Sequence, residues 1–386
     1  MFLRSLILAS CVIVSGFAQT VTSTSWSKIA PPVSGLSNSQ SLYAAGDGYL
    51  YLATHEGMWR ATEASVIATP AVPSIWSRIQ TGLVPDPTTP GHLMPVQRMA
   101  TAPDGSVWAL TGGKNASGVV MCCYASKLNQ TTKVWTTHTV YSRVSGFDHP
   151  TFLVWDTTGA MYYGTYFTAE VFKSTDGGVT WTNLTPGGIW NTLQNSSCYT
   201  GGFVSAIFHN GVLEIGGESP TFQITTGITH FHTIQDSMLS ACGSTNWHRN
   251  LGKHIVTDGT ATTPGTETLY IGKVDVVSGS PIYRCDGTST QCSVINNYSN
   301  SGSPWLGTVI DVAQGPALHE YWFTTGTYAA SSHVYHSTDG GLSWTYAPSE
   351  VGLTLGTSST NLMSISRSTG HKYLSTGPAL GLWVRK

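Results

Sequence analysis

Charge is scarce in this chain. Only 10% of its 386 residues are Asp, Glu, Lys or Arg, and 18 basic against 20 acidic residues leave a net charge of −2. A nucleic-acid-binding protein needs a basic stripe for the phosphate backbone, and the sequence has none, so we expect no nucleic-acid partner. Long stretches with helical spacing of apolar residues are also missing. Glycine (42 residues) and aromatic side chains (11%) are frequent instead, which is typical of many short strands and turns.

Long apolar runs are confined to the N-terminus. Arg4 precedes an apolar run over residues 6–14, and small residues follow up to Ala18. This is the pattern of a secretory signal peptide, and it is too short to span a bilayer. A buried first strand is the alternative, but it does not explain the charge before the run. We predict that residues 1–18 are removed and that residues 19–386 form one secreted, extracellular domain without a membrane span. Sequons compatible with glycosylation begin at Asn115, Asn129, Asn183, Asn195 and Asn297.

Cysteines are few. Apart from Cys11 in the signal peptide they form an even set, as suits an oxidising compartment: Cys122, Cys123, Cys198, Cys242, Cys285 and Cys292. Cys285 and Cys292 flank the turn segment DGTSTQ, so we predict a disulfide between them across the end of a hairpin. The pairing of the other four stays open. No second C-x-x-C or H-x-x-x-H motif completes a zinc site, and we predict neither a metal nor another cofactor.

The chain repeats itself seven times. One family of segments has a turn followed by alternating apolar residues, and its members begin at Asp47, Asp104, Thr158, Asn210, Thr266, His319 and His371. Asp-Gly and Asn-Gly accept positive φ and the alternation has period two, so each segment predicts a hairpin turn that leads into an inner strand. A second, offset family predicts short outer strands whose rings pack against the next repeat. Its members begin at Trp26, Trp76, Trp135, Trp181, Phe231, Cys292 and Trp344.

The order of the two families predicts how the repeats close into a ring. The outer segment at Trp26 precedes the first inner segment, whereas the last inner segment is followed by GLWVRK and no outer segment. The N-terminal strand therefore fills the outer position of the last repeat, so that no sheet edge stays open. We predict an all-β, seven-bladed β-propeller. Six or eight blades, or a double-sheet sandwich, explain the two interleaved sevenfold series less well.

Two segments, STDGGVTW and STDGGLSW, share the pattern Ser-x-Asp-x-Gly-x-x-Trp. Their matching residues are Ser174, Asp176, Gly178 and Trp181 in the first and Ser337, Asp339, Gly341 and Trp344 in the second. The carboxylate and hydroxyl suit hydrogen bonds within a turn, and glycine allows conformations that a Cβ forbids. Each segment lies between the expected third and fourth strands of a repeat. The fifth repeat has CDGTSTQC there, where a disulfide replaces the turn, so we expect a structural role and not catalysis.

This pattern resembles the Asp-box, or BNR repeat, of sialidases and other propeller proteins, including xyloglucan hydrolases, polysaccharide lyases, sortilin-type receptors and some lectins. The resemblance implies a propeller whose box turns lie on the face opposite the ligand site, and the repeat register extends it over nearly the whole mature chain. The Phe/Tyr-Arg-x-Pro motif of true sialidases is absent. Lys28 is the only cation of residues 26–54, where an arginine of the sialidase triad is expected. The resemblance therefore does not imply sialidase activity.

Loops on the face opposite those turns carry side chains suited to carbohydrate chemistry. Aromatic rings stack on sugars, paired carboxylates act as acid and base or nucleophile, and His with Arg supports proton abstraction beside a uronate carboxylate. The predicted catalytic residues are Glu56, Asp148, His149, Glu218, His248 and Arg249. The predicted substrate-binding residues are His55, Arg98, Tyr166, Trp247, Trp305 and Tyr328.

These loops differ from one repeat to the next, whereas a lectin should repeat its binding residues. We therefore favour a secreted carbohydrate-active enzyme with one central site, a glycoside hydrolase or polysaccharide lyase. It is expected to act as a monomer on a poly- or oligosaccharide. The alternative is a non-catalytic glycan-binding propeller, a lectin or adhesion protein. No GxSxG nucleophile elbow, phosphate-binding glycine loop or dinucleotide fingerprint is present.

Overall fold

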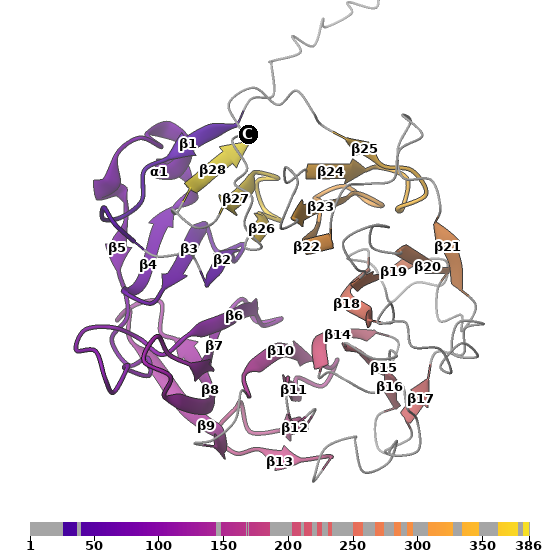
Figure 1. Ribbon diagram of the computed structural model, residues 1–386, viewed down its shortest axis with the longest axis horizontal. Coiled ribbons are helices and arrows are strands. Elements are labelled where there is room, and N and C mark those ends of the chain that lie inside the picture. The colour runs from indigo at the N-terminus through magenta and orange to yellow at the C-terminus, as the bar shows by residue number, and fades with distance from the viewer. Residues whose placement is uncertain are drawn as a thin grey trace, which may run out of the picture.

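The chain is an all-β β-propeller (Figure 1). The described strands form seven antiparallel sheets of four strands, which lie around a common centre. The computed structural model describes residues 26–36, 40–143, 148–166, 168, 170–185, 203–209, 212–217, 222–225, 231–233, 250–257, 267–273, 282–286, 292–295, 308–326, 334–346, 362–376 and 381–385.

From the centre outward, the sheets contain the following strands. The first three are β2(Ser41–Ala44), β3(Tyr49–Thr54), β4(Gly57–Thr62), β5(Ser77–Arg78); β6(Val96–Thr101), β7(Val107–Lys114), β8(Val120–Leu128), β9(Trp135–Arg143); and β10(Pro150–Trp155), β11(Met161–Thr165), β12(Val171–Ser174), β13(Thr182–Asn183). The next two are β14(Phe203–His209), β15(Val212–Gly217), β16(Phe222–Thr225), β17(Phe231–Thr233); and β18(Asn250–Thr257), β19(Glu267–Lys273), β20(Ile282–Asp286), β21(Cys292–Ile295). The last two are β22(Thr308–Gln314), β23(Tyr321–Gly326), β24(Val334–Ser337), β25(Thr345–Tyr346); and β26(Leu362–Ile365), β27(Lys372–Thr376), β28(Gly381–Arg385), β1(Ser27–Ile29).

The turn-and-strand segments are second strands and not inner ones, which corrects the sequence-based prediction. Their Asp-Gly signals mark the turn between the first and second strands. The backbone N–H of Tyr49 donates to Asp47 Oδ1 at 3.0 Å, and Gly48 has a φ of +85°. The strands that precede these turns are innermost. The sequence does not predict them, because they have no turn signal of their own. The second family is confirmed as the outermost strand of every sheet.

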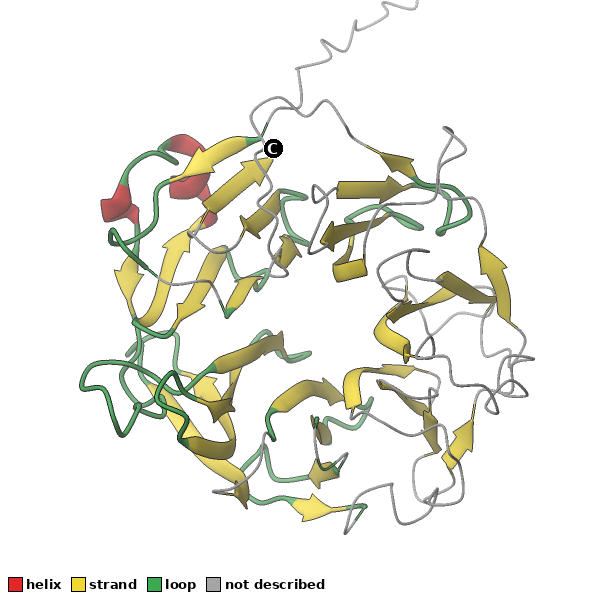
Figure 2. Ribbon diagram, viewed as in Figure 1, coloured by secondary structure: helices red, strands yellow, loops and turns green. Residues whose placement is uncertain are grey.

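The predicted ring closure is confirmed. β1 pairs with β28, with Ser27 opposite Val384 and Ile29 opposite Leu382, so the last sheet contains both ends of the described chain. A buried carboxylate joins this sheet to the first one. Glu63, 3% exposed, accepts hydrogen bonds from the hydroxyls of Ser366, Thr369 and Tyr373. Two short helices that the sequence did not predict, α1(Glu63–Ala68) and η1(Pro73–Ile75), lie between β4 and β5 (Figure 2).

A recurring pair of side chains fills the space between neighbouring sheets. An aromatic residue on the second strand lies opposite a cation or histidine on the third: Tyr51 and Arg60, Trp108 and Lys127, Tyr162 and Lys173, Trp322 and His336. The aromatic ring contacts the following sheet. Tyr162, for example, stacks on Phe208 of β14 at 5.8 Å. These rings join one sheet to the next, because large rings bury much apolar area.

The two Ser-x-Asp-x-Gly-x-x-Trp turns have the same hydrogen bonds and connect third to fourth strands, as predicted. In the first, Ser174 Oγ donates to Asp176 Oδ1 at 2.8 Å and accepts from the N–H of Gly178 at 2.9 Å. The ring N–H of Trp181 closes the turn on the carbonyl of Gly178 at 2.9 Å. A Cβ at Gly178 would lie 2.8 Å from Trp108 Cη2. This turn therefore packs against the preceding sheet. The ring of Trp181 packs there too, which corrects the predicted contact of this outer-strand ring with the next repeat.

Replacing Asp176 by asparagine is expected to lower the Tm by roughly 1–3 °C and to flatten its acid dependence. Hydrogen bonds from Thr180, Ser174 and Val179 lower the pKa of Asp176 to about 2. Between pH about 4 and 2 the unfolded chain therefore takes up this proton before the folded chain does, and stability falls as the pH falls. Thermal unfolding from pH 7 to pH 2 measures the difference. The control is Val179→Ala, an exposed neighbour, and an identical acid dependence in wild type and Asp176→Asn would contradict the expectation.

Candidate functional site

One face of the propeller carries the segments expected to bind a ligand. Neighbouring strands are antiparallel, so the turns between second and third strands share a face with the segments that enter the first strands. The two Ser-x-Asp-x-Gly turns lie on the opposite face. We call the first one the entry face; its described parts include residues 54–57, 79–95, 115–119, 148–149, 166, 168 and 170.

Asp148 is a buried brace of the entry face. Its side chain is 0% exposed, and Oδ2 accepts from Thr168 Oγ1 at 2.6 Å. Oδ1 accepts from the N–H groups of His149 at 3.1 Å and Thr168 at 3.4 Å. The sequence predicts a catalytic carboxylate here, and the structure places it among backbone and hydroxyl donors of the fold. Its hydrogen bonds hold the segment before β10 against the connection from β11 to β12.

His149 and Tyr166 form the partly exposed pair that this brace supports. Their rings stack with centroids 4.7 Å apart and planes at 20°, and the N–H of Tyr166 donates to the carbonyl of His149 at 2.9 Å. The two predicted site residues thus come together from two separate segments. An imidazole beside a phenol can take up and release protons near neutral pH.

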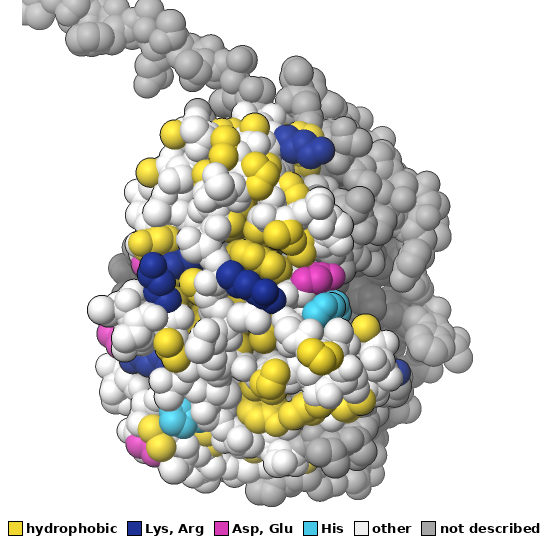
Figure 3. Space-filling view, turned by 90° about the vertical axis from the view of Figure 1, so that its left-hand side faces the viewer, with side chains coloured by type: hydrophobic (Ala, Val, Ile, Leu, Met, Phe, Trp, Pro, Cys, Tyr) yellow, Lys and Arg dark blue, Asp and Glu magenta, His cyan; other side chains and the backbone are white. Residues whose placement is uncertain are grey.

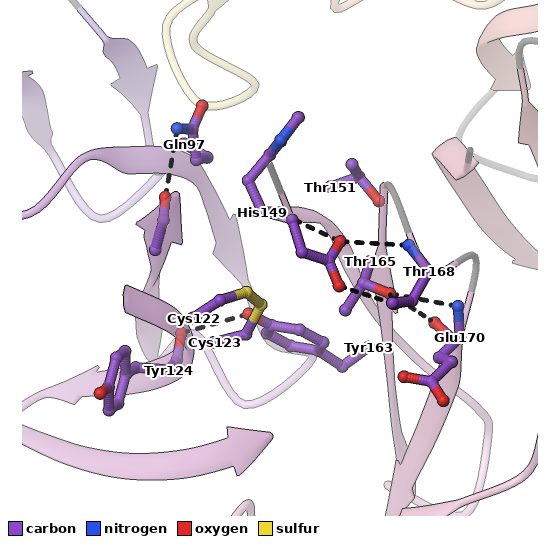
Figure 4. Close-up of a disulfide and its surroundings, with 12 residues drawn as sticks. Gln97, Cys122, Cys123, Tyr124, His149, Thr151, Tyr163, Thr165, Thr168 and Glu170 are labelled. Carbon is purple, nitrogen blue, oxygen red and sulfur yellow. Dashed lines mark hydrogen bonds between the residues drawn. A yellow bond between two sulfur atoms is a disulfide. The ribbon is translucent and has the colours of Figure 1, made fainter. Parts of the chain in front are cut away.

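A glycine of the neighbouring sheet, Gly113, leaves room for His149. Gly113 has a φ of +116°, and a Cβ there would lie 3.1 Å from Gln97 Nε2 and 3.3 Å from His149 Cβ. Gln97 Nε2 donates to the carbonyl of Gly112 at 3.2 Å (Figure 4). Sequence reasoning missed Gln97, whose only signal is its place at the start of an unrecognised inner strand.

Cys122 and Cys123 are joined by a disulfide below this site (Figure 4). Both are buried, at 1% and 0% exposure. A Cβ at Gly112 would lie 3.3 Å from Cys122 Cα and 3.2 Å from Pro150 Cδ, so the bridged pair packs close to the strand that follows His149. Cys285 and Cys292 are register partners on β20 and β21. Cys198 and Cys242 lie outside the described residues.

His55 and Glu56 lie together in the turn between β3 and β4. Both are partly exposed. The carbonyl of His55 accepts from the N–H of Leu93 at 2.9 Å, and the carbonyl of Glu56 accepts from Arg78 Nη2 at 2.7 Å. Burial lowers the pKa of His55, although the charge of Glu56 opposes the shift. This turn forms a second titratable part of the entry face.

Asp86 and Asn115 tie the long segment 79–95 to the second sheet. Asn115 Nδ2 donates to Asp86 Oδ1 at 2.7 Å and to Thr88 Oγ1 at 2.9 Å, and Asn115 is 4% exposed. Burial raises the pKa of Asp86, but hydrogen bonds from Thr88 and Asn115 outweigh it and the pKa is lowered. The side-chain amide of Asn115, the sequon residue that would carry a glycan, is therefore buried. No sequence motif had marked Asp86.

The predicted site residues of the later repeats lie outside the described residues: Glu218, Trp247, His248, Arg249, Trp305 and Tyr328.

The innermost strands enclose a central channel of about 830 Å³. Arg98 lies on its wall and is partly exposed, so this predicted binding residue does face a cavity. Described strands of six sheets line the channel: β2, β6, β10, β14, β22 and β26. On the outside, charged side chains are sparse and scattered over the side where β4 and β5 lie (Figure 3).

Within the described ranges, no three His, Cys, Asp or Glu side chains are grouped to hold a metal ion. None of the helices described here is long and apolar enough to cross a membrane.

Comparisons with known proteins identify the fold and no family. No protein-family model matches the chain, and no curated protein matches its sequence. A GH74 xyloglucanase from Xanthomonas campestris is similar in structure, with a TM-score of 0.63 and 14% identity over 94% of this chain and 53% of that one. This chain thus spans about half of the xyloglucanase. Virginiamycin B lyase from Staphylococcus aureus (TM-score 0.60, 10% identity) and YCF48 from Cyanidioschyzon merolae (0.57, 12%) each match over 94% of this chain and at least 98% of theirs.

Proposed function

We propose that this protein is a secreted carbohydrate-active enzyme that cleaves a glycosidic bond on the entry face. The stacked His149–Tyr166 pair carries the proposal. Hydrolysis and elimination both require a proton to reach the departing sugar oxygen, and histidine is the side chain that enzymes in general use most often for acid–base catalysis. Tyr166 offers an aromatic ring for sugar stacking and a hydroxyl next to the imidazole.

The asymmetry of the entry face supports one central site. The His149–Tyr166 pair belongs to the third sheet and the His55–Glu56 turn to the first, and neither is repeated within the described parts of the entry face, which belong to the first three sheets. Glycan-cleaving propellers are also found among similar structures, in the form of the xyloglucanase. Because a shared fold at this identity does not fix activity, the geometry of His149 and Tyr166 is the stronger support.

We infer that each four-stranded sheet is one blade, which gives the seven blades expected from the repeats, and that residues 1–18 direct export. The two Ser-x-Asp-x-Gly turns are proposed to be Asp-boxes. Cys285 and Cys292 are proposed to be bonded, since they are register partners at the end of a hairpin.

An activity screen of the mature protein, residues 19–386, tests the proposal. Xyloglucan, pectin, polygalacturonate, arabinogalactan and sialosides are each assayed for new reducing ends, and for the ultraviolet absorbance of unsaturated products. Binding is measured in parallel. Turnover of at least one polysaccharide is expected. Binding at more than one site per chain without turnover would instead identify a glycan-binding propeller, and absence of both would overturn a carbohydrate function.

A further inference from the structure

Three of the sequons lie within the described residues, at Asn115, Asn129 and Asn183. An N-glycan is attached to the side-chain nitrogen Nδ2, so a folded chain can carry one only where this nitrogen faces solvent and the sugar has room. The side-chain oxygen Oδ1 is not modified and can accept hydrogen bonds in a turn. The three asparagines differ in which of these two atoms the fold uses.

Asn115 uses its nitrogen inside the fold. The side chain is buried, and Nδ2 donates to Asp86 Oδ1 at 2.7 Å and to Thr88 Oγ1 at 2.9 Å. A glycan would leave a single N–H on this nitrogen, so one of the two hydrogen bonds would be lost. The sugar itself would also have to enter a buried site. A chain glycosylated at Asn115 would therefore not reach the described structure.

Asn183 also directs its nitrogen at the fold. It is half-buried at the end of β13, and Nδ2 donates to Oε1 of the buried Glu170 at 3.1 Å. The threonine of the same sequon, Thr185, is buried as well, and its Oγ1 accepts from the N–H of Val171 at 2.9 Å. A sugar on this nitrogen would compete with Glu170 for space and would disturb the pairing of β13 with β12.

Asn129 uses the two atoms the other way round. Its Oδ1 accepts from the N–H groups of Thr131 and Thr132, both at 3.0 Å, whereas no described residue forms a hydrogen bond with Nδ2. Residues 129–134 are all exposed. The side-chain oxygen thus closes an Asx-turn between β8 and β9, and the nitrogen is left to solvent.

Gln130, the next residue, holds this turn against the first sheet. Its Nε2 donates to Asp47 Oδ2 at 2.8 Å, and its Oε1 accepts from Nη1 of the buried Arg60 at 2.7 Å. The turn joins a third strand to a fourth, so it lies on the face opposite the entry face. A glycan on Asn129 would therefore cover that face and leave the entry face open.

We propose that Asn129 is an N-glycosylation site of this protein, and that Asn115 and Asn183 carry no glycan in the folded chain. In the transfer, Nδ2 forms a bond to the anomeric carbon of a lipid-diphosphate-linked oligosaccharide. The bond from that carbon to the diphosphate oxygen breaks, the lipid diphosphate leaves, and the nitrogen loses one proton. The proposal rests on the export in the proposed function, because this transfer takes place in the lumen of a eukaryotic secretory compartment. It does not depend on the proposed reaction.

Mapping the occupied asparagines of the secreted protein tests the assignment. Residues 19–386 are expressed in insect cells behind the host's own signal peptide, so that the result does not depend on residues 1–18. An endoglycosidase that leaves one sugar on each occupied asparagine is applied, and tryptic peptides are sequenced by mass spectrometry. Cleavage after Lys127 and Lys133 places Asn129 on a peptide without Asn115. We expect a glycan on Asn129 in most molecules and none on Asn115 or Asn183.

Two variants remove a sequon and keep its asparagine. Thr131→Ala removes the sequon of Asn129 but retains the backbone N–H that Oδ1 accepts, so the secreted protein should lose the mass of one glycan and stay folded. Ser117→Ala, the matched control, removes the sequon of Asn115 and should lose no glycan mass. Thermal unfolding shows whether each variant is folded.

Three results would overturn the assignment: an unoccupied Asn129 in the secreted protein, an unchanged glycan mass in Thr131→Ala, or a glycan on Asn115 or Asn183 of the folded protein. Export is tested separately with residues 1–386. If that chain stays inside the cell while residues 19–386 carry a glycan on Asn129, the proposed export fails and the glycosylation site is upheld. Turnover in the polysaccharide screen enters neither result.

Discussion

Replacing His149 by alanine is expected to lower kcat/KM on the substrate found in the screen by roughly 10²–10⁴-fold, because a proton-transfer residue typically contributes that much. Folding should be nearly unaffected. The side chain is partly exposed, and the brace from Asp148 uses the backbone N–H of His149, which alanine retains. Steady-state kinetics and the Tm of the variant check both parts.

Two further variants make this prediction specific. His138→Ala alters a partly exposed histidine on the outer strand β9 and should leave kcat/KM unchanged. Tyr166→Phe keeps the stacked ring and removes the hydroxyl, so it should change the pH profile of kcat more than KM. If His149→Ala kept wild-type turnover, or lost no more than His138→Ala, the role of His149 in proton transfer would be excluded.

Replacing Gly82 by alanine is expected to cost about 3 kcal/mol or more of unfolding free energy. Gly82 has a φ of +91°, and a Cβ there would overlap the carbonyl oxygen of Trp135. The backbone N–H of Trp135 donates to the carbonyl of Thr81 at 2.9 Å, and Thr137 Oγ1 donates to the carbonyl of Gly82 at 2.6 Å. An added methyl group would therefore separate the segment after β5 from the outer strand β9. Urea unfolding measures the loss.

Gly159 provides the matched control for this substitution. Its φ is +86°, almost the same as that of Gly82, but a Cβ there would have no atom within 4 Å. Gly159→Ala should therefore cost about 1 kcal/mol, the strain of a left-handed alanine alone. Equal losses for the two variants would show that backbone strain, and not the overlap with Trp135, sets the cost.

The fold was predictable wherever a local pattern repeats. Asp47 and Asp104 each accept a hydrogen bond from the N–H two residues later and are followed by a glycine of positive φ, so one short signal located one turn in several sheets. The innermost strands were missed because they carry no such punctuation. These strands line the central channel, and the alternation of apolar and polar residues is weak in them.

The types of residue in the candidate site could be predicted from the sequence, but how deeply each side chain is buried could not. Asp148 and His149 are adjacent in sequence, and nothing local indicates that one carboxylate is fully buried while the next side chain is partly exposed. The difference arises from Thr168, twenty residues away, whose hydroxyl and N–H both point to Asp148. Gln97 and the Asp86–Asn115 pair are long-range contacts of the same kind, and a single sequence does not show them.

The three-residue strand β1 has a consequence for the order of events in the cell. Its register partners are in β28, at the opposite end of the chain, so β1 has nothing to pair with until residues 381–385 have been synthesised. The sheets in between can form earlier, each from contiguous sequence, but the ring stays open. For a chain exported as proposed, closure is then the last step and takes place after the whole polypeptide has crossed the membrane. The fold therefore postpones ring closure to the compartment into which the protein is proposed to be exported.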